Sequence, residues 1–204
     1  NLEVTVTYTI KTNNEIRIDY EATTDKATVV NITQHSYFNL TGNAKRDILD
    51  HEVMIKSDNL ILVDAGLIPT GDLMPVEGTP FDFNTLIRVG ARIDDDHEQI
   101  KLGGGYDHCW VLNKSSQDAL EWTIKAVDPE SGRVLELATT EPGVQFYTGN
   151  FLDGSLTGKG GVVYKKRYGL CFEPEHYPDS PNQPNFPSAV LNPGEKYQTT
   201  TVWK

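Results

Sequence analysis

The stretch Asn31-Ile-Thr-Gln-His-Ser-Tyr-Phe-Asn-Leu40 places an imidazole within a run of β-branched and aromatic residues, a composition typical of a strand. The run extends from Thr28 to Leu40 without a proline, and the turn residues Thr41-Gly-Asn43 follow it, so we expect a strand that ends in a turn. Successive side chains of a strand point to opposite faces, which predicts one polar or amphipathic face made of Asn31, Thr33, His35 and Tyr37. Such a face can hydrogen-bond a sugar or another polar ligand.

His35 has two interpretations from its local sequence. Histidine has an unperturbed pKa of about 6.5, so this side chain could transfer a proton near neutral pH. It could also be a hydrogen-bonded strand histidine that faces water, which is the commoner situation. Residues elsewhere in the chain are needed to choose between the two.

Short strand patterns separated by turn residues continue along the chain. Further alternating or apolar runs are Leu2 to Ile10, Glu15 to Thr24, Ile48 to Lys56, Asn59 to Val63, Tyr106 to Leu112, Leu120 to Asp128, Arg133 to Thr140, Val144 to Thr148, Tyr168 to Glu173 and Lys196 to Trp203. Lys11-Thr-Asn-Asn14 and Asp128-Pro-Glu-Ser-Gly132 are predicted turns between neighbouring strands. About ten short strands with almost no helix predict an all-β protein, an antiparallel β-sandwich or barrel.

The remaining segments predict a helix and a long loop. Leu86 to Ile100 is the best helical candidate, and the acidic run Asp94-Asp-Asp-His-Glu98 could begin a second, short helix because the helix dipole favours negative charge there. Asp64 to Phe83 is rich in glycine and proline, which predicts a structured loop with short extended pieces.

Composition limits the class of protein. The 204 residues form one predicted domain, residues 1–204, and 38% hydrophobic and 23% charged residues fit a soluble globular chain. The net charge of -11 disfavours nucleic acid or an anionic membrane as partner, because both require a basic surface. No apolar run approaches the roughly 18 residues of a membrane span, and the first ten residues do not resemble a signal peptide.

Cysteine and histidine spacing argues against a disulfide framework and a metal centre. Cys109 and Cys171 each lie in an apolar strand pattern, so we expect reduced, buried thiols in a cytoplasmic protein; they could still pair if their strands are neighbours. The histidines lack zinc-type spacing with these cysteines, and Asp94 to Glu98 lacks the spacing and glycine of a calcium loop. No metal site is predicted.

Three polar residues at strand patterns are candidates for chemistry. Glu173 ends an apolar run and precedes Pro174, so it is either a partly desolvated general base or an exposed strand-end carboxylate. Asp107 follows three glycines that allow close backbone approach; the glycines precede a strand, so they do not form a dinucleotide-binding fingerprint. His108 should face the opposite way from Asp107, and Gln145 by itself is only a polar strand residue.

Longer motifs, spread along the chain, favour one interpretation of these candidate residues. His35-Ser-Tyr-Phe-Asn-Leu40 resembles the H-x-Y-F-N-L signature of the aldose 1-epimerases, also called galactose mutarotases. The resemblance continues, in the order of that family, through Phe81-Asp-Phe83, Gly105-Tyr-Asp-His108, Gln145-Phe-Tyr-Thr-Gly-Asn-Phe-Leu-Asp-Gly154, Phe172-Glu-Pro-Glu-His-Tyr-Pro-Asp179 and Leu191-Asn-Pro-Gly-Glu195, with Tyr197 and Trp203. The blocks span nearly the whole chain, so the resemblance is specific.

The resemblance implies a fold, an activity and four site residues. The implied fold is an antiparallel β-sandwich, the galactose mutarotase-like supersandwich. The implied activity is interconversion of the α and β anomers of aldohexoses such as galactose and glucose, without a cofactor. Glu173 resembles the catalytic base and His35 the catalytic acid, while Asp107 and Gln145 resemble residues that bind sugar hydroxyls; Glu175 matches no catalytic position.

The chain departs from the family at its start. The family carries a further histidine and an arginine in an upstream segment, and strands from that segment complete its sandwich. We therefore expect the N-terminal strands of the fold to be missing from this chain. The oligomeric state is not predicted.

Three other functions fit parts of the pattern. A non-catalytic carbohydrate-binding β-sandwich would keep the hydroxyl-binding residues and could stack sugars on Trp110, Tyr147 or Tyr177. A relative that acts on phosphorylated hexoses would need a basic cluster, for which Lys165-Lys-Arg167 is the local candidate. A structural β-domain would bind no sugar.

Overall fold

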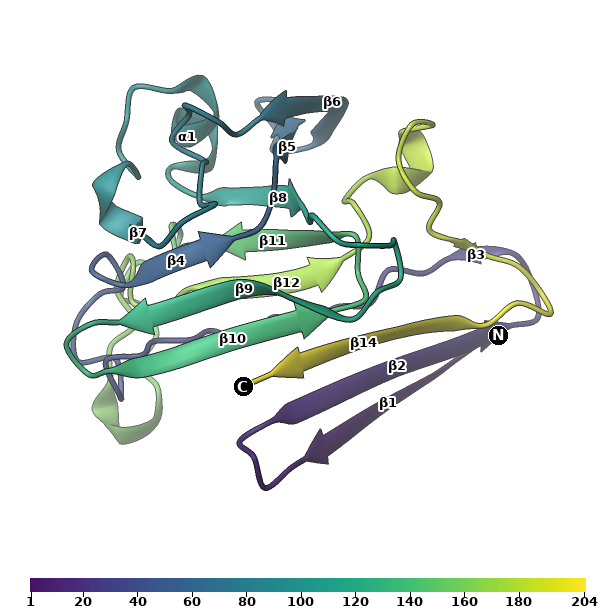
Figure 1. The fold of residues 1–204 in the computed structure, drawn as a ribbon, viewed down its shortest axis with the longest axis horizontal. Helices are drawn as coiled ribbons and strands as arrows, with labels where there is room; N and C mark the ends of the chain where they lie inside the picture. The colour runs from purple at the N-terminus through teal and green to yellow at the C-terminus, as the bar shows by residue number, and fades with distance from the viewer.

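The computed structural model describes residues 1–204 and confirms an all-β, antiparallel architecture (Figure 1). The larger sheet has the order β1 (Leu2–Ile10), β2 (Ile16–Thr24), β14 (Tyr197–Trp203), β10 (Arg133–Thr139), β9 (Glu121–Asp128), β4 (Glu52–Ile55) and β7 (Ile87–Arg88). The smaller sheet has the order β12 (Cys171–Glu175), β11 (Gly143–Tyr147), β8 (Asp107–Val111), β5 (Asn59–Val63) and β6 (Pro69–Pro75), and β13 (Val190–Leu191) pairs with β3 (Thr28–Val29).

Helices contribute little to the fold. The one α-helix, α1 (Glu98–Gly103), lies beside β8, and 3-10 turns occur at Val89–Ala91, Lys159–Gly161 and Ser180–Asn182. None of these helices has the length and apolar character needed to cross a membrane.

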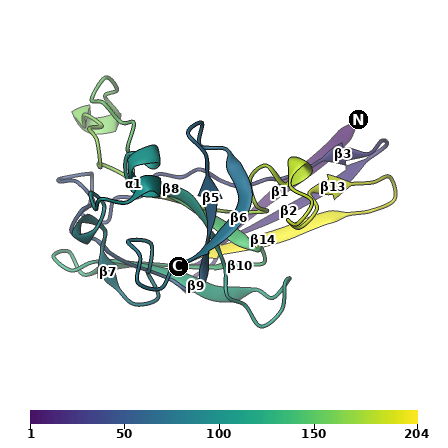
Figure 2. The ribbon, with the colours of Figure 1, turned by 90° about the horizontal axis from the view of Figure 1, so that it is seen from above.

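The two sheets lie face to face as two layers (Figure 2), and the main apolar core draws its residues from both of them. Trp110 of β8, Phe146 of β11 and Phe172 of β12 are fully buried and point toward the larger sheet, where Ile124 and Leu137 face them in the same cluster. Because strand side chains alternate, the neighbouring residues of β8, β11 and β12 point away from this core. That outer face carries the polar residues of the candidate site.

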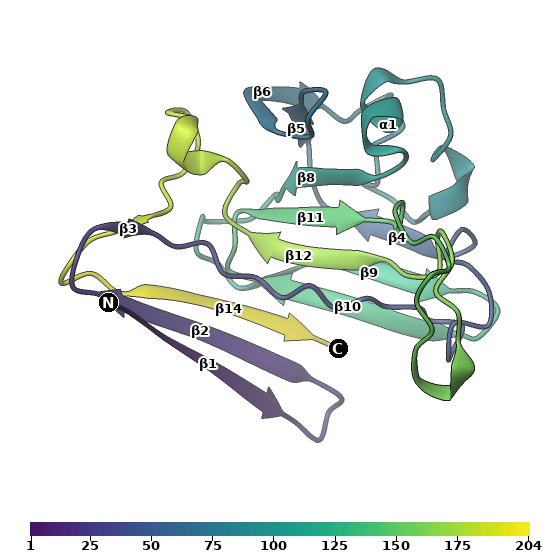
Figure 3. The ribbon, with the colours of Figure 1, turned by 180° about the vertical axis from the view of Figure 1, so that it is seen from behind.

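The apolar face of the larger sheet extends beyond the part that the smaller sheet covers. β1 is its edge strand, and Val6 and Tyr8 lie opposite Tyr20 and Ile18 of β2. The two β2 residues are buried, whereas Val6 and Tyr8 remain 41% and 62% exposed. β14, β2 and β1 project together from the body of the sandwich (Figure 3).

The strand predicted over Thr28 to Leu40 is wrong in its extent. β3 ends at Val29, and of the following residues only Phe38 makes an isolated bridge. The predicted alternation is partly lost as well, since Thr33 Oγ1 is buried without a partner while Tyr37 is half exposed. The segment forms no regular ladder; it runs beside β12 and is held there by two side-chain hydrogen bonds and the Phe38–Leu170 bridge, which are described with the site.

The helix predicted over Leu86 to Ile100 is also wrong. Its first part is β7 followed by a single 3-10 turn, because the N–H groups of Val89 and Gly90 donate to carbonyl groups of the segment that precedes β4. Only the acidic end leads into a helix: α1 follows His97, whose side chain accepts a hydrogen bond from the Gln99 N–H. Hydrogen bonds to a neighbouring segment therefore outweighed the local apolar spacing.

The turn predictions hold at the two hairpins and fail in the long loop. Asn14 between β1 and β2 and Gly132 between β9 and β10 adopt positive φ angles of 66° and 70°, as tight turns require. Asp64 to Phe83, predicted as a loop with short extended pieces, contains the seven-residue strand β6. β6 begins at Pro69 and ends at Pro75, and it tolerates both because it is an edge strand with one unpaired side.

The two cysteines are buried and free, as predicted. Cys109 lies on β8 and Cys171 on β12, and β11 separates these strands, so the two do not face one another as sheet neighbours. Burial raises the pKa of each thiol above its ordinary value, which keeps both protonated near neutral pH.

Candidate active site

Three neighbouring strands of the smaller sheet bring most of the predicted site residues together. β11 pairs with both β8 and β12, and its register places Gln145 opposite Glu173 and Tyr147 opposite Asp107. Residues paired across strands point to the same face, so these four side chains share the face that points away from the core.

The extended segment after β3 adds His35 to this face. Figure 3 shows this segment running beside β12. Three contacts fasten it there: Asn31 Nδ2 donates to the His176 carbonyl at 2.9 Å, Gln34 Nε2 to the Phe172 carbonyl at 3.2 Å, and Phe38 N to the Leu170 carbonyl at 2.8 Å. The contacts lie on both sides of His35 in sequence, so they hold its backbone against β12.

His35 and Glu173 form a close pair. His35 Nε2 lies 3.4 Å from Glu173 Oε1; the histidine side chain is 50% exposed and the glutamate side chain 11%. The Tyr37 ring stacks on His35 with centroids 5.1 Å apart, and Tyr147 approaches edge-on at 6.2 Å. A ligand can therefore reach the imidazole from solvent and meet the carboxylate beneath it.

The environment of Glu173 suits proton transfer near neutral pH. Burial raises the pKa of its carboxyl to about 7, the nearby His35 partly opposes this shift, and Asp107 adds to it. A group whose pKa lies near the working pH can both accept and release a proton readily. Glu173 does not end its strand, as the sequence pattern predicted, but lies in the middle of β12, and burial there is the main cause of its raised pKa.

Asp107 and Gln145 form a second hydrogen-bonding unit beside that pair. Gln145 Nε2 donates to Asp107 Oδ1 at 2.9 Å, which leaves the second oxygen of Asp107 available as an acceptor. Burial raises the pKa of Asp107, and the hydrogen bond from Gln145 and the nearby His35 oppose that shift. Polar groups of this kind can hold the hydroxyls of a sugar.

Only one of the three aromatic residues that could stack on a sugar lies at the site. Trp110 is fully buried in the core and Tyr177 packs against Phe186, so neither lies at the site. Tyr147 does lie there, next to His35. His108 is fully buried on the core side, as its alternation with Asp107 predicts.

The basic cluster considered for a phosphate does not present its arginine to the site. Arg167 is buried, and its guanidinium donates to the Gly104 carbonyl at 2.7 Å and to Thr148 Oγ1 at 2.9 Å. Its donors are thus used to join the turn before β8 to the end of β11. Arg167 supports the backbone that carries Asp107 and Tyr147.

We expect Gly105→Ala to destabilise this support more than Gly104→Ala. A Cβ at Gly105 would lie 2.5 Å from the Arg167 guanidinium, which is buried and hydrogen-bonded, and the residue has φ +135°. Strained backbone of this kind costs about 1–3 kcal/mol before any displacement of Arg167 is added. Gly104 also has positive φ, +61°, but a Cβ there meets nothing within 4 Å, so it is the matched control. Urea unfolding of both variants measures the difference, and equal losses would contradict a role for the clash.

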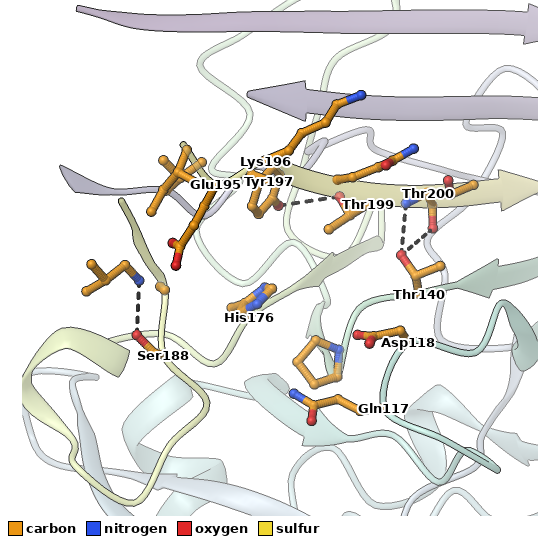
Figure 4. A pocket seen from close by; sticks show the side chains of 16 residues that line it. Gln117, Asp118, Thr140, His176, Ser188, Glu195, Lys196, Tyr197, Thr199 and Thr200 are labelled. Atoms are coloured by element: carbon orange, nitrogen blue, oxygen red, sulfur yellow. Dashed lines mark hydrogen bonds between the residues drawn. The ribbon is translucent and has the colours of Figure 1, made fainter. Parts of the chain in front are cut away.

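A cavity lined by polar and apolar residues lies away from this pair. It measures about 770 Å³ and lies between β14, the segment around β13 and the end of β12, with Thr140, Tyr197 and Thr200 in its wall (Figure 4). His176, three residues after Glu173, lies at its rim and its Nδ1 is 2.7 Å from the buried Glu141 carboxylate. The sequence offered no motif for these residues, because they come from β14 and from the bends after β10 and β12, which are far apart in the chain.

Cys171 is a site neighbour that the sequence analysis placed in the core. It precedes Glu173 by two residues on β12, so the strand period puts both side chains on one face. That spacing was visible in the sequence, but the apolar surroundings suggested only a core thiol. The side chain is buried directly behind the His35 and Glu173 pair.

Known proteins resemble the whole chain. A family model described as aldose 1-epimerase matches residues 1–204. The galactose mutarotases of Mus musculus and Homo sapiens are 48% and 47% identical over 203 residues, which is 100% of this chain and 57% of each relative. An aldose 1-epimerase from Escherichia coli is 38% identical, with 100% of this chain and 58% of the relative covered.

Solved structures give the same result for the fold. An aldose epimerase homologue from C. elegans superposes with a TM-score of 0.87 at 28% identity, covering 100% of this chain and 59% of that one. A galactose 1-epimerase from Lactobacillus acidophilus superposes with a TM-score of 0.81 at 27% identity, covering 100% and 57%. The chain thus spans somewhat more than half the length of the proteins it matches.

Proposed function

Since the chain belongs to the aldose 1-epimerase family, we propose that the protein interconverts the α and β anomers of an aldohexose such as galactose or glucose. The chain spans 57% of the length of its mammalian relatives, so the activity, the substrate and the residue roles all belong to this proposal. One observation carries it: His35 Nε2 and Glu173 Oε1 lie 3.4 Å apart, with the imidazole half exposed to solvent and the carboxylate largely buried.

Anomer exchange requires proton transfers at two oxygens that are bonded to one carbon. The hemiacetal opens when a base takes the proton of the anomeric hydroxyl and an acid protonates the ring oxygen; rotation and closure then give the other anomer. Both oxygens are bonded to the same carbon, so the acid and the base must lie close together. Glu173 serves as base and protonated His35 as acid, and the two roles reverse on closure.

The second unit positions the sugar. The free oxygen of Asp107 accepts a hydrogen bond from a sugar hydroxyl, and Gln145, fixed by its bond to Asp107, presents its amide to another. Tyr37, which is half exposed, offers ring surface to the pyranose, whereas the buried Tyr147 packs edge-on against the imidazole.

Acid–base residues and positioning suffice for this reaction. No oxidation or group transfer occurs, so the proposal includes no cofactor. Anomers also exchange slowly in water, and each general acid or base contributes roughly 10²–10⁴-fold. The proposal places the protein in the cytoplasm, where free thiols such as Cys109 and Cys171 are the usual state.

Polarimetry of freshly dissolved α-galactose and α-glucose tests the function. The complete gene product that contains residues 1–204 should bring the optical rotation to equilibrium faster than buffer, in proportion to its concentration. An exchange rate equal to that of buffer, with sugar binding still detectable by calorimetry, would replace the proposal with a carbohydrate-binding role.

A further inference from the structure

The candidate site also assembles three side chains with metal-binding atoms. One ligand atom each from His35, Cys171 and Glu173 lies within 4.8 Å of the other two. Cys171 and Glu173 share a face of β12, and the contacts on either side of His35 hold the imidazole over them. The cluster therefore results from backbone positions that the fold holds in place, and not from one flexible side chain.

The donor set is typical of zinc. Imidazole nitrogen, thiolate sulfur and carboxylate oxygen are all Zn²⁺ ligands, whereas magnesium and calcium favour oxygen alone. An ion with bonds of about 2.0–2.3 Å to such atoms holds its tetrahedral ligands roughly 3.3–3.6 Å apart. The distance of 3.4 Å between His35 Nε2 and Glu173 Oε1 already meets this requirement. The third atom, Cys171 Sγ, lies within 4.8 Å of the other two, so small side-chain adjustments are needed for all three to reach one ion.

Charge and access also suit a divalent cation. A carboxylate and a thiolate together balance the two positive charges of the ion. Three protein ligands leave one tetrahedral position for water, which is the arrangement of an open zinc site. The half-exposed side chain of His35 gives solvent a path to that position.

We propose that Zn²⁺ binds to His35, Cys171 and Glu173 and thereby blocks the site. As the Zn–S bond forms, the Cys171 thiol releases its proton to solvent, and the ion exchanges bound water for the three side chains. The imidazole nitrogen and the carboxylate oxygen are then occupied by metal and can no longer carry protons to or from a sugar. Binding stands independently of the proposed function; only the inhibition rests on it.

Cobalt alone provides a test that does not depend on activity. Co²⁺ takes up tetrahedral zinc sites, and a cobalt–thiolate bond gives a charge-transfer absorption band in the near ultraviolet. We expect this band to grow until one equivalent of Co²⁺ has been added to the reduced protein, and to disappear when Zn²⁺ is added afterwards. Cys171→Ser should abolish the band, and His35→Asn should weaken cobalt binding at least tenfold.

Cys109→Ser is the matched control, because Cys109 is also a buried strand thiol but is not in the cluster. It should keep the band. Circular dichroism of each variant identifies any that fails to fold, and a misfolded Cys171→Ser is replaced by Cys171→Ala. The proposal is overturned by cobalt binding without a thiolate band, or by a band that persists in a folded Cys171 variant.

A second measurement distinguishes a failure of the metal-site proposal from a failure of the proposed function. Each protein is assayed by polarimetry with and without micromolar Zn²⁺, and the ratio of the two rates is compared between variants. A ratio well below one in the parent protein that returns to one with a chelator or with Cys171→Ser supports inhibition. A cobalt band together with no catalysis in metal-free protein would leave the metal site standing and reject the proposed function.

Discussion

Glu173→Gln is expected to lower the catalysed rate of anomer exchange by about 10²–10⁴-fold, the contribution of one general acid or base. The amide has nearly the same shape as the carboxylate, but it cannot take the proton of the anomeric hydroxyl. His35→Asn should cause a loss of similar size, since asparagine keeps a polar group on the surface but carries no titratable nitrogen. Polarimetry at saturating galactose measures both rates.

Glu175→Gln provides a matched control for the first variant. Glu175 lies two residues beyond Glu173 on the same face of β12, and burial, Glu173 and Glu141 raise its pKa to about 8. It forms no pair with His35, so its variant should retain most of the rate. Similar losses in both glutamate variants would show that any substitution of a glutamate on this strand is harmful and would remove the specific role of Glu173. Full activity of a folded His35→Asn would reject the histidine as acid.

Trp110→Ala is expected to destabilise the protein by about 3–5 kcal/mol, the usual result of truncating a large buried aromatic side chain. The Trp110 ring is fully buried among Phe83, Tyr106 and Phe146, and its Nε1 donates to the Phe81 carbonyl at 3.0 Å. Truncation would leave a cavity between the sheets and an unpaired carbonyl. Urea or guanidinium unfolding followed by circular dichroism measures the change in midpoint.

Trp122→Ala supplies the control for that prediction. Trp122 is also a strand tryptophan, but it is 42% exposed, so its truncation should change the free energy of unfolding by only about 0.5 kcal/mol. A loss for Trp110→Ala no larger than this control would mean that the sandwich does not depend on the cluster around Trp110.

Local patterning predicted most strands, because alternation and turn residues act over a few neighbouring positions. It failed where hydrogen bonds to segments distant in sequence decided the conformation. The apolar spacing of Leu86 to Ile100 fits a helix, yet Val89 and Gly90 bond to the segment before β4 and the first part is extended. Thr28 to Leu40 has strand composition, yet only Thr28–Val29 finds a strand partner.

The sequence by itself determined the strand-rich class, the turns at the hairpins, the opposite orientation of Asp107 and His108, and, through its motifs, the family. The tertiary structure alone decided that His35 and Glu173 meet at 3.4 Å and that Cys171 lies with them. The physical reason is the separation of the residues in sequence. Side-chain periodicity orients residues along one strand, whereas His35 and Glu173 are brought together by hydrogen bonds between segments 138 residues apart, such as that from Gln34 to the Phe172 carbonyl. Such contacts depend on the position of β12 in the assembled sheet, so no local pattern encodes them.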